Sequence, residues 1–231
     1  QNTDRQAEMD AFLYQFFNQA VMAKYLPDVI GGLWITLALA GLVIVTGILL
    51  GLALACLRSF QISWINWLII IFIDLFRALP PLVLLIVGYF GLPYAGLQLS
   101  GFAISWLCLS CVLGAFAEEI FWAGITSVHK GQWEAARSTG LGFSQTLSYV
   151  VIPQAIRMTI PPLTNRTIAI TKNTALASVV AVQEMLTVAQ TSLAYAANTS
   201  PLTLAAIGYL IVFLPLVISS RWIETRFAWK R

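Results

Sequence analysis

The chain has 231 residues, of which 59% are hydrophobic and only 10% are charged, and its formal net charge is +3. Because soluble globular domains carry about 25% charged residues, this composition excludes a soluble domain and indicates a membrane protein. The small net charge gives no support for nucleic-acid binding, and the length fits one membrane domain. The three cysteines and the single histidine, His129, are too few and too scattered to make a metal site.

Residues 1–28 form the first predicted element, an N-terminal arm that precedes the first long apolar segment. Apolar side chains recur in it at near-helical spacing among polar ones, which predicts an amphipathic helix at the membrane surface rather than a span. These side chains are Met9, Phe12, Leu13, Phe16, Phe17 and Met22. No pattern of charged region, apolar core and small-residue cleavage site is visible, so a removed signal peptide is not expected.

Residues 29–231 are expected to form one transmembrane domain, because they consist mostly of apolar segments long enough to cross a bilayer. We place about five transmembrane helices in it, at residues 33–57, 64–94, 99–125, 154–182 and 201–220. The fold class is therefore an all-α, polytopic membrane protein. In the first span Gly47, Gly51 and Ala55 form a small-residue stripe, for which packing inside the subunit is favoured over a subunit interface. In the second, Pro80 and Pro81 should kink or interrupt the helix.

Charged residues inside the spans are unfavourable to insert, so each needs a partner or a function. Asp74 and Arg77 are three residues apart, which places them on one helical face and predicts a structural ion pair. Glu118 and Glu119 fall near the middle of the third span. Three interpretations of these two acids stay open: a gate, a ligand for substrate, or ion pairs with the basic residues of the fourth span.

The fourth span is apolar but carries those basic residues, Arg166 and Lys172, as well as Pro161 and Pro162, which predict a broken helix. Its polar residues either bond to neighbouring helices or line an aqueous path, and the break favours the path. With the two acids they make up a candidate substrate pathway of Glu118, Glu119, Asn165, Lys172, Asn173 and Thr174. Residues 183–200, which follow, are polar and alanine-rich and are expected to form an external hairpin.

The positions of lysine and arginine predict the orientation of the chain. With five spans, the turn at Arg58, the loop at Lys130–Arg137 and the basic C-terminus all fall on one side, and the acidic N-terminal arm falls on the other. Basic loops face the cytosol in membrane proteins. We therefore expect the N-terminus outside and the C-terminus in the cytosol.

A short polar segment interrupts the apolar pattern between the third and fourth spans. Residues 132–139 predict a helix of about two turns that ends at Gly140, where a left-handed residue is favourable only for glycine. Ala135 and Ala136 give this helix a small-residue face that another backbone could approach closely, and Glu134 adds one fixed charge. The segment at about 131–143 is therefore predicted to be a docking surface on the cytosolic side.

The same segment resembles the EAA loop of type I ABC importer permeases. The resemblance lies in Glu134-Ala135-Ala136, then Gly140, then Val150-Val151-Ile152-Pro153, in which Val150 and Ile152 are conservative departures from the family pattern. Flanking motifs are similar to the polar amino-acid branch, which includes histidine, glutamine and arginine permeases. These motifs are Phe76–Leu82, Glu119-Ile120, Gly131-Gln132-Trp133, Pro153-Gln154-Ala155, Pro161–Asn165 and Lys172-Asn173-Thr174.

The resemblance implies the membrane subunit of an ATP-driven importer for polar amino acids or close analogues, in the bacterial cytoplasmic membrane. Its implied partners are a second permease subunit, identical or homologous, two ATPase subunits that bind ATP and magnesium, an extracytoplasmic substrate-binding protein and the lipid bilayer. No cofactor is implied in this chain. The implied ATPase-docking residues are Gly131, Gln132, Trp133, Glu134, Ala135, Ala136 and Gly140.

Two other classes of function stay open from the residues themselves. One is a passive channel or secondary transporter, and the other is a membrane subunit that docks an ATPase without moving solute. No G-x-x-x-x-G-K-[ST] phosphate-binding loop occurs in the sequence, so the chain is not expected to hydrolyse ATP. No nucleophile–base or zinc pattern occurs either, which argues against an intramembrane enzyme.

Overall fold

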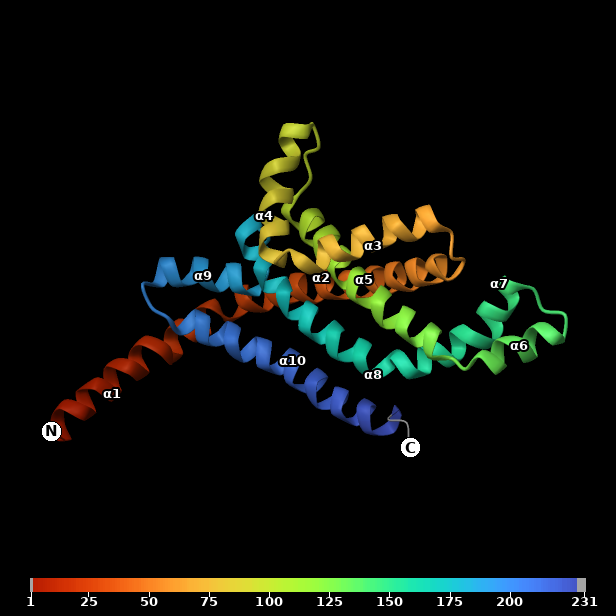
Figure 1. Ribbon diagram of the computed structural model, residues 1–231. Coiled ribbons are helices and arrows are strands. Elements are labelled where there is room, and N and C mark those ends of the chain that lie inside the picture. Colours follow the sequence, from red (N-terminus) through yellow and green to blue (C-terminus); the bar gives the residue numbers. More distant parts are fainter. Residues whose placement is uncertain (1, 228–231) are drawn as a thin grey trace.

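The protein is a bundle of helices joined by short connections (Figure 1). A computed structural model describes residues 2–227, and this part of the chain contains no strand, which confirms the all-α class. In chain order the elements are α1 (Asn2–Phe16), α2 (Gln19–Ser59), α3 (Ser63–Ala78), α4 (Pro81–Gly91), η1 (Leu92–Ala95), α5 (Gly101–Ser127), α6 (Lys130–Ser138), α7 (Phe143–Thr146), η2 (Leu147–Val151), α8 (Ile152–Thr171), η3 (Lys172–Val180), α9 (Met185–Ala196) and α10 (Ser200–Phe227).

The number of membrane spans agrees with the sequence pattern. Within the described residues three helical stretches, which contain α2, α5 and α10, are long and apolar enough to cross a membrane, and the number rises to five if each of two bent pairs is one span. The first pair is α3 with α4, bent by 103°. Pro80 and Pro81 lie at this break, as predicted. Pro81 is the first residue of α4, where a backbone N–H has no partner within the helix, so the N–H that proline lacks is not needed there.

The core of the bundle lies between α2 and α5. Along this contact the backbones approach closely: a Cβ atom added to Gly51 would lie 2.5 Å from the Cβ of Ala117, and one added to Gly47 would lie 2.8 Å from that of Leu113. Ala55, the third member of the small-residue stripe, is fully buried in the same contact region. The stripe therefore packs inside the subunit, as the sequence favoured.

The N-terminal arm does not end at residue 28. Helix α2 runs from Gln19 through Pro27 without a break, and Gly32 within it packs against the start of α9, where an added Cβ would lie 2.8 Å from the Cα of Met185. This contact keeps the polar and glycine-containing stretch helical, which local pattern alone did not indicate. Only α1 stands apart, projecting from the bundle (Figure 1), and Gln1 lies outside the described residues.

Hydrogen bonds join the segment between α1 and α2 to the turn before α10. The backbone N–H of Thr199 donates to the carbonyl of Gln15 at 3.0 Å, and the side-chain amide of Asn198 donates to the carbonyl of Tyr14 at 2.9 Å. The N–H of Asn18 donates to the hydroxyl of Ser200, again at 2.9 Å. The first and last long helices are thereby joined at one end of the bundle.

Two predictions for the second half of the chain are wrong. Pro161 and Pro162 do not break the fourth span, because α8 continues through them to Thr171 and the helix changes to a tighter winding only at Lys172. Each proline removes a single backbone donor, which a helix packed on its neighbours tolerates. Residues 183–200 are not a simple hairpin, since they contain helix α9.

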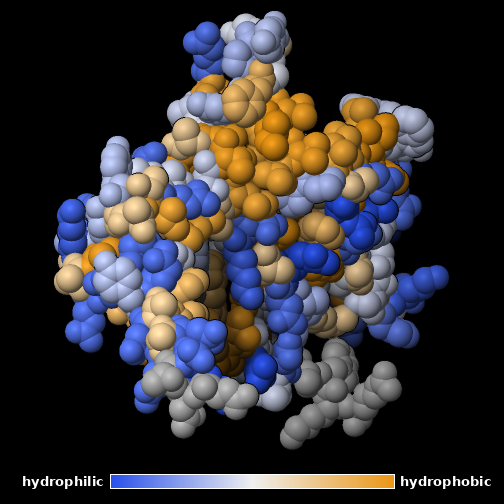
Figure 2. Space-filling model, turned by 90° about the vertical axis from the view of Figure 1, so that its left-hand side faces the viewer, coloured by the Kyte–Doolittle hydropathy of each residue, from blue (hydrophilic) through white to orange (hydrophobic). Residues whose placement is uncertain are grey.

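Apolar side chains remain exposed on much of the surface, as a lipid-facing protein requires. Figure 2 shows a continuous apolar region on the upper part of the molecule, where α4 stands out from the bundle below a more polar tip. Exposed apolar residues of α3 and α4 include Leu68, Ile71, Leu82, Val83, Ile86, Val87 and Phe90. The surface character agrees with the composition.

Candidate functional site

The predicted docking helix is α6, which begins at Lys130 and ends at Ser138. It starts two residues earlier than the prediction because the Nδ1 atom of His129 accepts the backbone N–H of Gly131 at 3.1 Å and caps the helix. It ends as predicted: Gly140 has φ +91°, and its N–H donates to the carbonyl of Arg137 at 3.0 Å. His129, although exposed, therefore positions this helix.

The faces of α6 differ from the prediction in one respect. Ala136 is buried against the bundle, whereas Ala135 is exposed, so the two alanines do not share one open face. Successive residues of a helix point about 100° apart, and the sequence could not say which of them faces inward. Glu134 and Ala135 are exposed next to each other on the outward side of the rod, whereas Gln132 is exposed on the side that faces α8.

Aromatic side chains connect α6 to the end of α2. The ring of Trp133 stacks on that of Phe143 with centroids 5.5 Å apart, and Phe143 lies 5.3 Å from Phe60, the residue after α2. We call Trp133, Phe143 and Phe60 the aromatic clasp. These are favourable distances for aromatic pairs, and they tie a short polar helix to a long apolar one.

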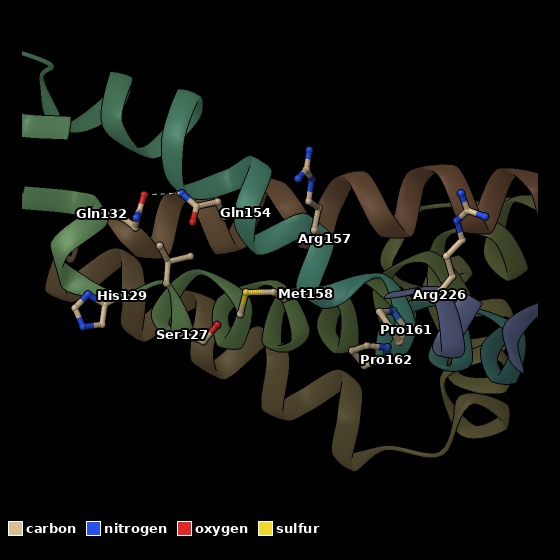
Figure 3. A pocket seen from close by; sticks show the side chains of 10 residues that line it. Ser127, His129, Gln132, Gln154, Arg157, Met158, Pro161, Pro162 and Arg226 are labelled. Carbon is tan, nitrogen blue, oxygen red and sulfur yellow. Dashed lines mark hydrogen bonds between the residues drawn. The ribbon is translucent and has the colours of Figure 1, made fainter. Parts of the chain in front are cut away.

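A second connection runs from α6 to α8. The side-chain amide of Gln154 donates to the Oε1 atom of Gln132 at 3.3 Å, and it also donates to the carbonyl of Val150 at 2.8 Å (Figure 3). Val151, in the second part of the EAA-like pattern, is fully buried, and Pro153 stands in the first turn of α8. The EAA-like pattern thus corresponds to helix α6 and to the start of α8, the span that follows it.

The two acids of the third span make separate ion pairs. Glu118 is fully buried, and both of its oxygens accept from Nη1 of Arg58, at 3.1 and 3.3 Å. The guanidinium of Arg58 also lies over the ring of Trp122, 4.7 Å from its centroid. Glu119, which is exposed, pairs with Arg77. Each acid therefore makes an ion pair, but with Arg58 or Arg77 and not with Arg166 or Lys172.

The predicted pair between Asp74 and Arg77 is wrong. Arg77 turns to Glu119 on α5, and Asp74 makes no ion pair with any residue between 2 and 227. Arg166, one of the two basic residues considered as partners for Glu118 and Glu119, lies over the ring of Phe116, 3.8 Å from its centroid. Spacing within one helix placed Asp74 and Arg77 on one face, but packing between helices determined the partner.

The candidate pathway residues do not form one continuous strip. Glu119, Asn165 and Lys172 are exposed on the surface of the chain, and Lys172 lines a groove of about 600 Å³ between η3 and α10. Thr174 is fully buried and its hydroxyl donates to the carbonyl of Thr171. Glu118 and Thr174 therefore cannot face a path in this arrangement, and Asn173 is only half-buried.

Sequence reasoning missed one buried carboxylate. Glu184 has no exposed surface and caps the start of α9, where its Oε1 accepts the backbone N–H of Thr187 at 2.8 Å. Its other oxygen accepts the hydroxyl of Tyr209 on α10 at 2.6 Å. Glutamate followed three residues later by threonine is only a weak signal for the start of a helix. The expected hairpin at residues 183–200 gave no reason to place a helix start there.

The family of the chain follows from a match over most of its length. Residues 47–229 match the family described as the inner membrane component of binding-protein-dependent transport systems. The chain belongs to this family. It is the membrane-spanning permease subunit of an ABC importer and not an enzyme, because ATP hydrolysis is carried by a separate subunit.

Two bacterial permeases show the extent of the similarity. The probable glutamine ABC transporter permease protein GlnM of Bacillus subtilis (strain 168) is 35% identical over 201 residues, which cover 84% of this permease and 91% of the relative. The L-cystine transport system permease protein TcyB of the same organism is 35% identical over 170 residues, covering 74% and 73%.

Solved structures support the same assignment. A crystal structure of an amino acid ABC transporter with histidines matches at 32% identity with a TM-score of 0.79, covering 89% of this permease and 96% of that chain. The inward-facing MetNI methionine ABC transporter matches at 17% identity with a TM-score of 0.67, covering 87% and 96%, and shares the fold.

Proposed function

We propose that this permease imports polar amino acids or close analogues. The support is that permeases named for glutamine and cystine transport are about one-third identical to it over most of its length. Exposed side chains of both charges occur on this chain, namely Glu119 paired with Arg77, and separately Lys172. Amino acids carry both charges, so these groups are suited to a zwitterionic substrate.

The shape of α6 is the main support for a role in coupling transport to an ATPase subunit. It is a short helix with a cap at its start, a left-handed glycine after its end, and an outward surface that includes Glu134 and Ala135. We infer that this surface sits in a groove of an ATPase subunit. A rod fixed at both ends transmits a displacement as a rigid body, which a flexible loop cannot do.

The proposed assembly contains a second permease subunit, identical or homologous, two ATPase subunits and an extracytoplasmic binding protein. ATP and magnesium would be held by the ATPases, because the sequence of this chain has no phosphate-binding loop. ATP-driven closure of the ATPases would bring the two docking helices together and open the substrate path outward. The N-terminus lies outside and the C-terminus in the cytosol in this proposal. Lys230 and Arg231, which support that orientation, lie outside the described residues.

Two substitutions in the full complex test the docking role. Glu134→Lys reverses the charge of the outward surface, and Gly140→Leu forces a side chain into a left-handed conformation. We expect both to leave membrane insertion intact and to reduce uptake at least tenfold while ATP hydrolysis continues. Uptake that stays coupled to hydrolysis in both variants would contradict the proposal.

Each variant has a matched control far from α6. Glu8→Lys makes the same charge reversal at an exposed position of α1, and Gly96→Leu places a side chain at the other left-handed glycine, φ +82°, where nothing lies within 4 Å. Both controls should transport normally. The substrate itself is tested in the reconstituted complex by asking which amino acid, with its receptor, stimulates ATP hydrolysis.

A further inference from the structure

A cavity of about 880 Å³ opens beside α6, between the end of α5, the first half of α8 and the end of α10 (Figure 3). Its polar rim includes Arg157 from α8, Arg226 from α10 and His129 at the start of α6. We call this space the basic cavity. Among residues 2–227, none of those that line it is acidic, although they come from four separate segments of the chain.

The two arginines are not used in ion pairs by the part of the chain that the structure describes. Its ion pairs join Arg58 to Glu118 and Arg77 to Glu119. The acid nearest to Arg226 in sequence, Glu224, accepts from the side-chain amide of Asn165 and does not line the cavity. Both arginines line the cavity, and the guanidinium of Arg226 also lies over the ring of Trp222, 5.2 Å from its centroid. Because neither arginine pairs with an acid within residues 2–227, the cavity favours an anionic ligand.

The histidine adds a directional donor to this rim. Its Nδ1 atom accepts the N–H of Gly131, so a neutral imidazole carries its proton on Nε2 and can donate from that atom. The donors at the cavity thus include two planar guanidinium groups and one imidazole N–H, besides the neutral side chains of Ser127, Gln132 and Gln154. This set suits the several oxygen atoms of a phosphate group.

The lining also has an apolar part, and the cavity lies where the spans end. Met158, Pro161 and Pro162 line the cavity on α8, whereas Ser127 is the last residue of α5 and Arg226 stands in the last turn of α10. Figure 3 shows Met158 and the two prolines on the same stretch of α8 that carries Arg157. Such an apolar wall contributes nothing to the binding of a free inorganic anion, whereas a lipid places its acyl chains against the wall and its headgroup at the rim.

We infer that the basic cavity binds an anionic glycerophospholipid, with the phosphate held by Arg157 and Arg226 and the first acyl carbons against Met158 and Pro161. The inference rests on the proposed orientation, which puts this end of the bundle at the cytosolic face. Because Gln132 of α6 also lines the cavity, a bound lipid would lie directly beside the docking helix.

Lipid binding by the purified, delipidated complex tests this inference without any transport measurement. Native mass spectrometry would follow titration with phosphatidylglycerol, with phosphatidylcholine and with inorganic phosphate. We expect wild-type protein to retain phosphatidylglycerol in preference to phosphatidylcholine. Arg157→Gln with Arg226→Gln should weaken phosphatidylglycerol binding by about 25-fold, since each arginine near an anionic lipid contributes about fivefold in affinity.

The matched control is Arg221→Gln, which removes an exposed arginine from α10 outside the cavity and should leave lipid binding unchanged. Equal binding of phosphatidylglycerol by wild type and the double variant would overturn the inference, as would equal retention of phosphatidylcholine. Displacement of the lipid by millimolar inorganic phosphate would identify a free-anion site instead. These outcomes do not depend on coupling, so failure here and failure of the docking role are distinguishable.

Discussion

At the scale of single residues, the ion pair between Arg58 and Glu118 is the most consequential polar contact. Glu118 has no exposed surface, whereas the side chain of Arg58 keeps 20% of its own, and the pair joins the end of α2 to α5. A buried carboxylate without its cation is strongly unfavourable in a membrane protein. The ion pair with Arg58 therefore explains the presence of Glu118 in this span better than a substrate-binding role does.

The first prediction concerns this pair. Arg58→Met should destabilise the complex by about 3 kcal/mol, the low end for breaking a buried pair, because it leaves Glu118 uncompensated. Adding Glu118→Leu should restore most of that loss. Thermal unfolding of the purified complex measures both changes. If the two substitutions are simply additive, the pair does not carry the coupling that its geometry indicates.

Glu118→Gln also separates structure from selectivity. Since the carboxylate faces Arg58 and not an open path, the variant should lose stability but keep the same preference among arginine, histidine, glutamine and glutamate. Competition for uptake among these amino acids is the measurement. A changed order of preference would return Glu118 to the substrate pathway.

At the scale of elements, the close contact between α2 and α5 depends on glycine. Gly51 faces the backbone and side chain of α5 with no room for a Cβ atom, whereas Gly41 on the same helix has nothing within 4 Å of its Cβ position. The same substitution at the two sites therefore isolates packing from helix propensity.

We expect Gly51→Ala to destabilise the protein by about 1–3 kcal/mol, because the two helices must move apart to relieve the overlap. Gly41→Ala should be neutral or slightly stabilising, since alanine favours the helix. Melting temperatures of the two purified variants provide the comparison. Equal melting temperatures would show that α2 and α5 are not as closely packed as the structure indicates.

The aromatic clasp is the second element-scale feature. Phe143 touches both Trp133 of α6 and Phe60 beyond α2, so it is the residue through which the docking helix holds the first span. Phe143→Leu keeps an apolar side chain but removes both ring contacts. We expect uptake to fall about tenfold while ATP hydrolysis persists, because movement of α6 would no longer carry α2 with it.

The control for the clasp is Tyr195→Leu, which removes an exposed ring from α9. It should leave uptake unchanged. Double substitution of Phe60 and Trp133 should be no worse than Phe143→Leu alone if the three rings act as a unit. A further, independent loss in the double variant would show that α6 works through another contact, for which the bond from Gln154 to Gln132 is the first candidate.

At the scale of the whole molecule, the prediction is the orientation of the bundle. Ser138 at the end of α6 and Tyr195 on α9 are both exposed, and five spans place them on opposite sides of the membrane. In the proposed orientation Ser138→Cys should react with an impermeant thiol reagent only in inverted vesicles. Tyr195→Cys should react only in intact cells. Labelling of Ser138→Cys from outside would reverse the orientation and exclude the docking role.

The native cysteines provide the baseline for that experiment. Cys56, Cys108 and Cys111 are all partly buried and free, so a background in which they are replaced by serine or alanine should keep the fold. Uptake by this background establishes that it is functional. Labelling is then read against the cysteine-free protein.

The sequence by itself determined the all-α class, the five apolar segments, the break at Pro80 and Pro81 and the short rod closed by Gly140. Each of these depends on features local to the chain: the length of an apolar run, a missing donor, or a conformation that only glycine adopts at little cost. The EAA-like pattern likewise lies within one continuous segment. The structure and the family match agree with these predictions for that reason.

Only the tertiary structure decided which residues meet. It paired Arg77 with Glu119 instead of Asp74, buried Ala136 but not Ala135, and kept α8 helical through two prolines. These outcomes depend on which helix lies opposite, and no spacing along one helix contains that information. The basic cavity has the same origin, because its residues come from segments that only the folded bundle brings together.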